Sequence, residues 1–145
     1  MQVLLSAPGG RVLEGLSSNF FAVVGGAVHT AGEGVLEGSV RHLILELARR
    51  EGIPVVLTPP RLADLDSWEG CFISSTSRLL LPVDELLLLL PPGHGAAAGM
   101  AGANGAGRSG APSVGGRRFP GGGLVRRLEG LVLREVQATS EPLFA

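Results

Sequence analysis

Glycine, alanine, serine and proline dominate the sequence between about Pro91 and Gly116, and this segment limits most strongly how the chain can fold. Such a composition cannot bury enough apolar surface to offset the conformational entropy lost on ordering, so residues 91–116 are predicted to be disordered. The core must therefore come from the residues before this segment and from Phe119 onward. Because 145 residues suit one domain, we interpret 91–116 as a surface insertion within a single domain, 1–145.

The first thirty residues alternate between apolar segments and glycine turns. Met1 to Leu5 is predicted to form a short strand that ends at the turn "APGG". Val12 to Val24 is predicted to be a second strand region. The pair Gly25–Gly26 then suits a tight hairpin, because glycine adopts positive φ at low cost, and Ala27 to Thr30 is the expected return strand.

The strongest helical pattern lies in "GSVRHLILELARREGIP". Its apolar residues recur at helical spacing, and they are Val40, Leu43, Ile44, Leu47 and Ala48. Ser39 is predicted to cap the start of this helix and Gly52 its end.

The rest of the chain mixes both kinds of element. We expect a strand at Val55–Leu57, a helical turn at Leu62–Trp68, and two strands in "CFISS" and "RLLLPV" joined at Ser75–Ser77. A last helix is marked by four apolar residues, Leu124, Leu128, Leu131 and Val132. The pattern predicts an α+β fold.

Composition excludes several classes of function. The formal net charge is −1, so no overall field attracts nucleic acid, and a single cysteine, Cys71, permits no internal disulfide. No signal peptide is visible, and the leucine run Leu86–Leu90 is far shorter than a membrane-spanning helix. The histidines lack metal-ligand spacing. We therefore expect a soluble intracellular protein that binds neither metal nor membrane. The segment "GRSGAPSVGGRRFPGGG" is similar to Arg/Gly RNA-binding segments, but an inert insertion is the favoured interpretation.

Three features could carry chemistry, and each has a plain structural alternative. Glu14 and Asn19 are a carboxylate and an amide at the entrance to an apolar strand, where an ordinary turn would also place them. "LEGSVR" leads a glycine directly into a helix, whose first amides at Ser39 and Val40 would suit an anion such as phosphate. The polar run Ser74–Ser77 breaks two strands, and could cradle a phosphate or a carboxylate or be a simple hairpin turn.

Taken in order, "VLEGLSSNFFAV", "VLEGSVRHLILELARREGIPV", "CFISSTSRLLLPV" and "GGGLVRRLEGLV" resemble the C-terminal half of the class IV aminotransferases. That family depends on pyridoxal 5′-phosphate, and includes branched-chain and D-amino-acid aminotransferases and aminodeoxychorismate lyase. The resemblance implies the C-terminal α+β domain of the fold-type IV enzymes and amino-group transfer between an amino acid and a 2-oxo acid. It also implies a homodimer.

The resemblance also assigns roles to residues. Glu14 matches the glutamate that contacts the pyridine nitrogen of the cofactor, and keeps that nitrogen protonated. The backbone amides of Ser39 and Val40, together with Thr76, match the groups that hold the cofactor phosphate. The amides of Thr76 and Ser77 match the turn that receives the substrate carboxylate. Asn19 and Arg41 match motif positions that we interpret as structural.

One departure from the family concerns the catalytic amine. The family forms a Schiff base between its cofactor and a lysine upstream of the matched region, yet all twelve basic residues here are arginine. No catalytic residue is therefore assigned, and the chain alone is predicted to be inactive, as a fragment of a longer enzyme. A fragment of an aminodeoxychorismate lyase-like enzyme and a non-catalytic truncated paralogue are the alternatives.

Overall fold

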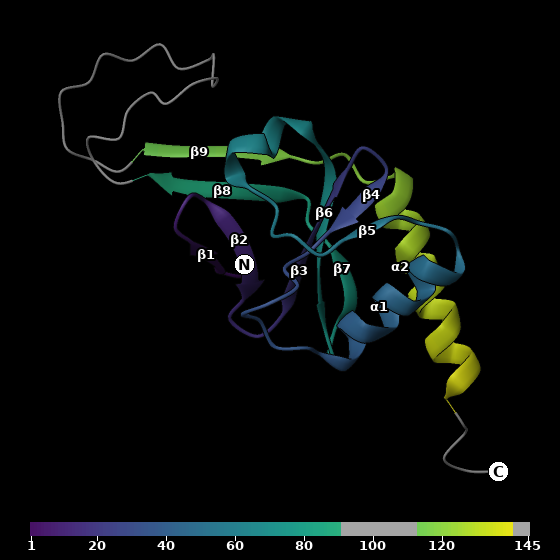
Figure 1. The fold of residues 1–145 in the computed structure, drawn as a ribbon. Helices are drawn as coiled ribbons and strands as arrows, with labels where there is room; N and C mark the ends of the chain where they lie inside the picture. The colour runs from purple at the N-terminus through teal and green to yellow at the C-terminus, as the bar shows by residue number, and fades with distance from the viewer. Residues whose placement is uncertain (91–112, 141–145) are drawn as a thin grey trace. The chain divides into compact units, whose positions relative to one another are not determined.

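The computed structural model describes residues 1–90 and 113–140 of the chain (Figure 1). These residues fall into two compact units. The larger unit contains residues 1–84 and 119–140, and the smaller unit contains residues 85–90 and 113–118. Each unit is described by itself below.

The larger unit combines a seven-stranded sheet with helices, as an α+β fold requires. Its strands are β1 (Leu4–Ala7), β2 (Arg11–Gly15), β3 (Asn19–Val24), β4 (Ala27–His29), β5 (Val55–Val56), β6 (Trp68–Ser75) and β7 (Leu79–Pro82). Its helices are α1 (Ser39–Arg50), the short 3₁₀ helix Leu62–Ser67 and α2 (Gly123–Thr139). No helix among the described residues is long and apolar enough to cross a membrane.

Strand β3 organises the sheet. One edge of β3 pairs with β6 along its whole length, and β6 in turn pairs with β7. On its other edge β3 pairs first with β2, at Asn19, and then with β4, from Ala22 to Val24. All these pairings are antiparallel, whereas β4 and β5 run parallel. The predicted strand region Val12–Val24 is therefore two strands, because the polar residues after Gly15 form a turn between β2 and β3.

The predicted hairpin between β3 and β4 is confirmed. Gly25 and Gly26 have φ of 57° and 74°, values that residues other than glycine rarely adopt. The other predicted strands and the helical turn are also present, although β1 begins three residues later than expected and β6 begins at Trp68 instead of Cys71.

The core lies between one face of the sheet and the two α-helices (Figure 1). Alternate residues of β3 point to this face, and Phe21 stacks on Phe72 of β6 with ring centroids 4.6 Å apart. The opposite face carries Phe20, whose ring lies 5.8 Å from that of the buried Trp68. Cys71 is also buried.

Helix α1 follows its predicted apolar pattern. Its buried residues are Val40, Arg41, Ile44, Leu47 and Ala48. The predicted cap was wrong: Gly38 is the N-cap, Ser39 is the first helical residue, and no side chain caps the helix start. Gly52, with φ of 68°, ends the helix as predicted.

Helix α2 packs against α1 and β7. Its buried residues Val125, Leu128 and Val132 belong to the core, as the predicted C-terminal helix implies. Two exposed ion pairs, Arg50 with Glu135 at 3.4 Å and Arg127 with Glu51 at 3.1 Å, join the surfaces of the two helices.

The smaller unit is a two-stranded antiparallel hairpin of β8 (Glu85–Leu90) and β9 (Ser113–Arg118). The sequence did not predict it. Residues 91–112 of the predicted insertion lie outside the described residues, but Ser113–Gly116 belong to β9, so the expected end of the disordered segment was wrong. The amino-acid composition indicates only how much apolar side-chain surface a segment can bury. Here the backbone of Gly115 and Gly116 pairs with the backbone of β8, and such pairing needs no side chain.

Candidate functional site

Glu14 and Asn19 are direct neighbours across β2 and β3, and Asn19 is in turn paired with Ser74 of β6. Residues paired in this way point to the same face of a sheet. That face is the one covered by the helices, because Ser74 is also paired with Leu80, a core residue. The sheet therefore places a carboxylate, an amide and a hydroxyl in one row at the end where β2 and β6 stop and β3 and β7 begin.

The carboxylate of Glu14 is held on one side only. Its Oε2 accepts a hydrogen bond from the backbone amide of Leu36, at 3.1 Å. Its Oε1 accepts none from residues 1–90 or 113–140, and the side chain is partly exposed. The carboxylate of Glu14 is thus fixed in orientation, while its other oxygen, Oε1, remains free to accept a hydrogen bond from a ligand.

Asn19 holds the same residue, Leu36, through its carbonyl group. Its Nδ2 donates to the carbonyl oxygen of Leu36 at 2.6 Å, and the residue is only 6% exposed. This carbonyl also accepts from the amide of Gly38, at 3.1 Å. Glu14 and Asn19 are therefore both tied to the residue that lies three positions before α1.

The start of α1 is rich in free donors. The first bond of the helix runs from the amide of His42 to the carbonyl of Gly38, at 3.0 Å. The amides of Ser39 and Val40 have no acceptor in the described part of the chain, and they lie at the positive end of the helix dipole. Ser39 is exposed and Val40 is buried.

Thr76 and Ser77 form the exposed turn between β6 and β7, as predicted. The hydroxyl of Ser75 shapes this turn by accepting from the amide of Arg78, at 3.2 Å. Leu79 then has a φ of 58°, a costly value for a leucine, so the surrounding structure must hold the turn in place. Since Ser74 is next to Asn19 in the sheet, the turn lies at the same end of the sheet as Glu14.

Two buried polar atoms near this end have no hydrogen-bond partner in the described residues. Ser74 is 2% exposed and its Oγ makes no hydrogen bond. Arg41 is 6% exposed; its Nη2 donates to the carbonyl of Ala31 at 2.9 Å, while its Nε is unpaired. The sequence predicted Ser74 only as part of the polar run Ser74–Ser77, with no role of its own. The sequence feature that could have identified Ser74 is its position two residues after Phe72, because alternate residues of a strand share a face and a hydroxyl would then lie on the core face of an apolar strand.

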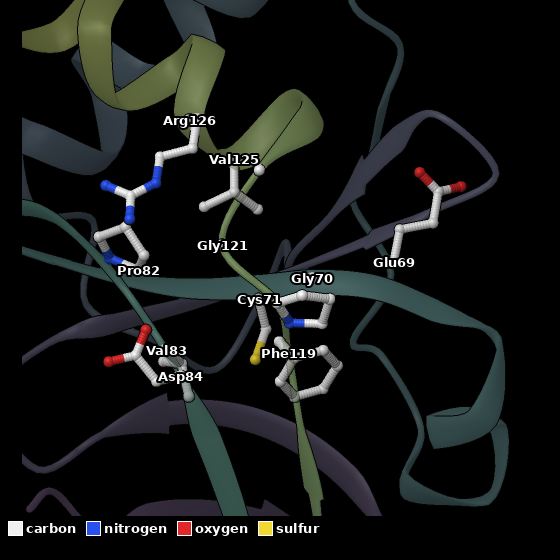
Figure 2. Close-up of a pocket in the computed structure, with 12 residues that line it drawn as sticks. Glu69, Gly70, Cys71, Pro82, Val83, Asp84, Phe119, Gly121, Val125 and Arg126 are labelled. Carbon is white, nitrogen blue, oxygen red and sulfur yellow. The ribbon is translucent and has the colours of Figure 1, made fainter.

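Two cavities of the larger unit lie away from these residues. One of ≈ 10 Å³, about the space of a single water, lies between the start of α2 and β6, beside Cys71, Phe119 and Val125 (Figure 2). An open hollow of ≈ 300 Å³ adjoins it at Glu69 and Gly122. Neither is lined by Glu14, and both are shallow or very small, whereas the row of polar groups has free donors and acceptors.

The sequence profile "Amino-transferase class IV" matches residues 1–86. A Methanocaldococcus jannaschii protein assigned as a branched-chain-amino-acid aminotransferase is 37% identical over 79 residues, which are 53% of this chain and 27% of that protein. The branched-chain amino acid aminotransferase of T.th., solved in complex with N-(5′-phosphopyridoxyl)-L-glutamate, is 26% identical with a TM-score of 0.53, over 58% of this chain and 28% of that one.

A third protein is similar in fold. The branched-chain aminotransferase of Thermoproteus uzoniensis, solved with norvaline, has a TM-score of 0.69 over 97% of this chain and 38% of its own, at 20% identity. This chain therefore spans well under half the length of the relatives that it matches. The matched profile covers more than half of the chain, and the chain belongs to the class IV aminotransferase family.

Proposed function

We propose that this chain forms part of the cofactor site of a pyridoxal 5′-phosphate-dependent aminotransferase, which transfers an amino group between an amino acid and a 2-oxo acid. The family supports the reaction class, and the complex of the T.th. relative with a phosphopyridoxyl compound supports the cofactor. The observation that carries the proposal is the half-anchored carboxylate of Glu14 in a row of polar groups near the free amides of α1.

The residues fit a ligand with two unlike ends. A phosphate requires several donors, and the amides of Ser39 and Val40 together with the Thr76 hydroxyl supply them. A protonated ring nitrogen requires a carboxylate oxygen without a competing partner, which Oε1 of Glu14 provides. The orphaned hydroxyl of Ser74 shows that this end of the sheet also has unused capacity for a hydrogen bond.

Each residue then has a distinct task. Pyridoxal 5′-phosphate, when bound, supplies a ring that withdraws electrons from the α-carbon of the substrate. Glu14 holds the proton at the ring nitrogen through Oε1, while Leu36 prevents the carboxylate from turning away. The helix start and Thr76 bind the phosphate, and the amides of Thr76 and Ser77 receive the substrate carboxylate.

The amine that the reaction needs does not come from this chain, since all twelve basic residues are arginine. We therefore propose that the 145 residues alone do not turn over any amino acid, and that activity requires the remainder of a class IV enzyme, assembled as a homodimer. A non-catalytic relative that only binds anions is the second candidate, and the same lack of lysine favours it. A fragment of an aminodeoxychorismate lyase-like enzyme is a further alternative. It would have the same cofactor site as an aminotransferase fragment, and only the substrate of the complete enzyme would differ.

Binding of the cofactor to the isolated chain tests the proposal. Titration calorimetry with pyridoxal 5′-phosphate should give saturable binding that Thr76→Ala weakens about tenfold, since it removes one hydrogen bond to a charged group. Glu14→Gln should alter the affinity by less than about threefold, because the phosphate contacts carry most of it. Thr139→Ala, an exposed threonine near the end of α2, serves as the matched control. Equal affinities for the parent and Thr76→Ala would refute the assignment, and so would turnover of an amino acid by the isolated chain.

A further inference from the structure

We propose that Asn19 and Gly38 are positioning residues that fix the Glu14 carboxylate relative to the start of α1, through the peptide groups of Leu36. The functional meaning of this arrangement rests on the proposed cofactor site, whereas the arrangement itself does not. We call these contacts of Leu36 with Glu14, Asn19 and Gly38 the Leu36 clamp.

The clamp holds Leu36 by its backbone alone. Its amide donates to Glu14 Oε2 at 3.1 Å, and its carbonyl accepts from Asn19 Nδ2 at 2.6 Å and from the Gly38 amide at 3.1 Å. The Leu36 side chain, by contrast, is 80% exposed and buries little apolar surface. These hydrogen bonds, and no packing of its own side chain, therefore determine where residue 36 lies.

Gly38 is glycine because of Asn19, not because of its own backbone. Its φ of −65° and ψ of 149° suit any residue. A Cβ placed on Gly38, however, would lie 2.7 Å from Asn19 Oδ1, closer than real Cβ contacts allow. A methyl group there would push the amide of Asn19 away, and the shortest bond of the clamp would be lost or distorted.

Asn19 is well suited to transmit such a shift. It is nearly buried, and it is the first residue of β3, where it is paired with Glu14 on one side and with Ser74 on the other. Displacing its side chain removes the shorter of the two hydrogen bonds that the carbonyl of Leu36 accepts, so residue 36 is held less firmly. A shift of Leu36 moves its amide, and with it the carboxylate of Glu14 that accepts from this amide. A change at Gly38 should therefore reach Glu14 without touching the carboxylate.

A purely structural role for the clamp would shape the loop before α1 without affecting Glu14, and two measurements separate these possibilities. The first is the hydrogen-exchange rate of the Leu36 amide, followed by NMR in the isolated chain. The second is the ¹⁵N chemical shift of the ring nitrogen of labelled pyridoxal 5′-phosphate added to the chain, which reports the protonation of that nitrogen.

Four variants give a matched set. Gly38→Ala should accelerate exchange at Leu36 on the order of fivefold, the effect of one lost hydrogen bond, and should move the ring-nitrogen shift toward the unprotonated value. Glu14→Gln should leave exchange unchanged, since the Gln carbonyl still accepts from Leu36, but should move the shift in the same direction. Gly130→Ala, a helical glycine with open space at its Cβ, should change neither.

Asn19→Ala, alone and combined with Gly38→Ala, completes a double-mutant cycle. Because it removes the atom that the new methyl group would meet, Gly38→Ala should add almost nothing in the Asn19→Ala background. Additive effects of these two changes, or a Leu36 exchange rate in Gly38→Ala equal to the parent's, would overturn the clamp. A normal ring-nitrogen shift in Gly38→Ala despite faster exchange would overturn its positioning role. If the parent binds no cofactor, the proposed function fails, and the exchange rates still decide whether the clamp exists.

Discussion

Replacing Leu128 with alanine should show whether α2 belongs to the same folded unit as the sheet. Leu128 is fully buried in the core, although residues 85–118 separate α2 from the sheet in sequence. The change removes three carbon atoms, which costs about 2.5 kcal/mol in transfer free energy. Incomplete collapse of the resulting cavity adds to this cost, so we expect a loss of about 3–4 kcal/mol. Leu133→Ala on the same helix is the control, because Leu133 is 45% exposed and should cost about 1 kcal/mol or less.

Urea unfolding followed by far-ultraviolet circular dichroism measures both free energies. A change in midpoint at constant slope would mean that only stability changed. The fluorescence of Trp68, which lies in β6, reports the sheet separately, and the two transitions should coincide if α2 and the sheet unfold together. A difference of less than about 1 kcal/mol between Leu128→Ala and Leu133→Ala, or separate transitions, would refute the packing of α2 on the sheet.

Other substitutions test individual contacts of the larger unit. Gly130→Ala should stabilise the chain by about 0.5–1 kcal/mol in urea unfolding, because it adds helix propensity in α2 where the Cβ meets nothing. Thr30→Val should destabilise by about 1–2 kcal/mol in the same assay, since it leaves the carbonyl of Phe20 without the buried bond of 2.7 Å that Thr30 Oγ1 donates. The hydrogen bond and charge of Arg49 lower the pKa of Glu46 below its usual 4.5, so this pair stabilises the fold at neutral pH and ceases to do so as the pH falls below 4.5. The melting temperatures of the parent and Glu46→Gln should therefore converge in acid, and a constant difference between neutral and strongly acidic pH would contradict this interpretation.

The elements that the sequence predicted well are those specified locally. The body of α1 follows from a periodic apolar face, and the hairpin after β3 follows from two glycines that can take positive φ. The capping role of Ser39 was wrong because a serine before a helix fits either the N-cap or the next position, and spacing alone does not separate them. The structure selects Gly38 as the N-cap, next to Asn19, and this contact between residues far apart in sequence leaves no trace in the local pattern.

The same reasoning explains what was missed in the smaller unit. The leucine run of β8 is a strand because it has a partner, Ser113–Arg118, that lies beyond the glycine-rich segment. Only Val114 in that partner is typical of a strand, and two of its six residues are glycine. A hairpin of this kind depends on pairing across residues 91–112, and composition in a local window points away from it.

The candidate site was predicted residue by residue but not as an arrangement. Glu14 and Asn19 are separated in sequence, and only the turn between β2 and β3 makes them direct neighbours. Their shared contact with Leu36 depends on the path of the loop before α1, which has no periodic pattern to predict it.

This arrangement places hydrogen-bond donors and acceptors on opposite sides of Leu36 at this end of the sheet. On one side of Leu36 lie the free amides of α1, followed by the buried guanidinium of Arg41, whose positive charge is unfavourable at a helix N-terminus unless an anion is near. On the other side lies the carboxylate of Glu14 with one unpaired oxygen. A ligand that carries negative charge at one end and a proton donor at the other satisfies both sides at once, whereas a simple anion satisfies only the helix. Inorganic phosphate should therefore bind with the same dependence on Thr76 as the proposed cofactor. A chain that recognises the whole cofactor should also show a ring-nitrogen shift that changes in Glu14→Gln, whereas the weak anion binding of a non-catalytic relative should leave that shift independent of Glu14.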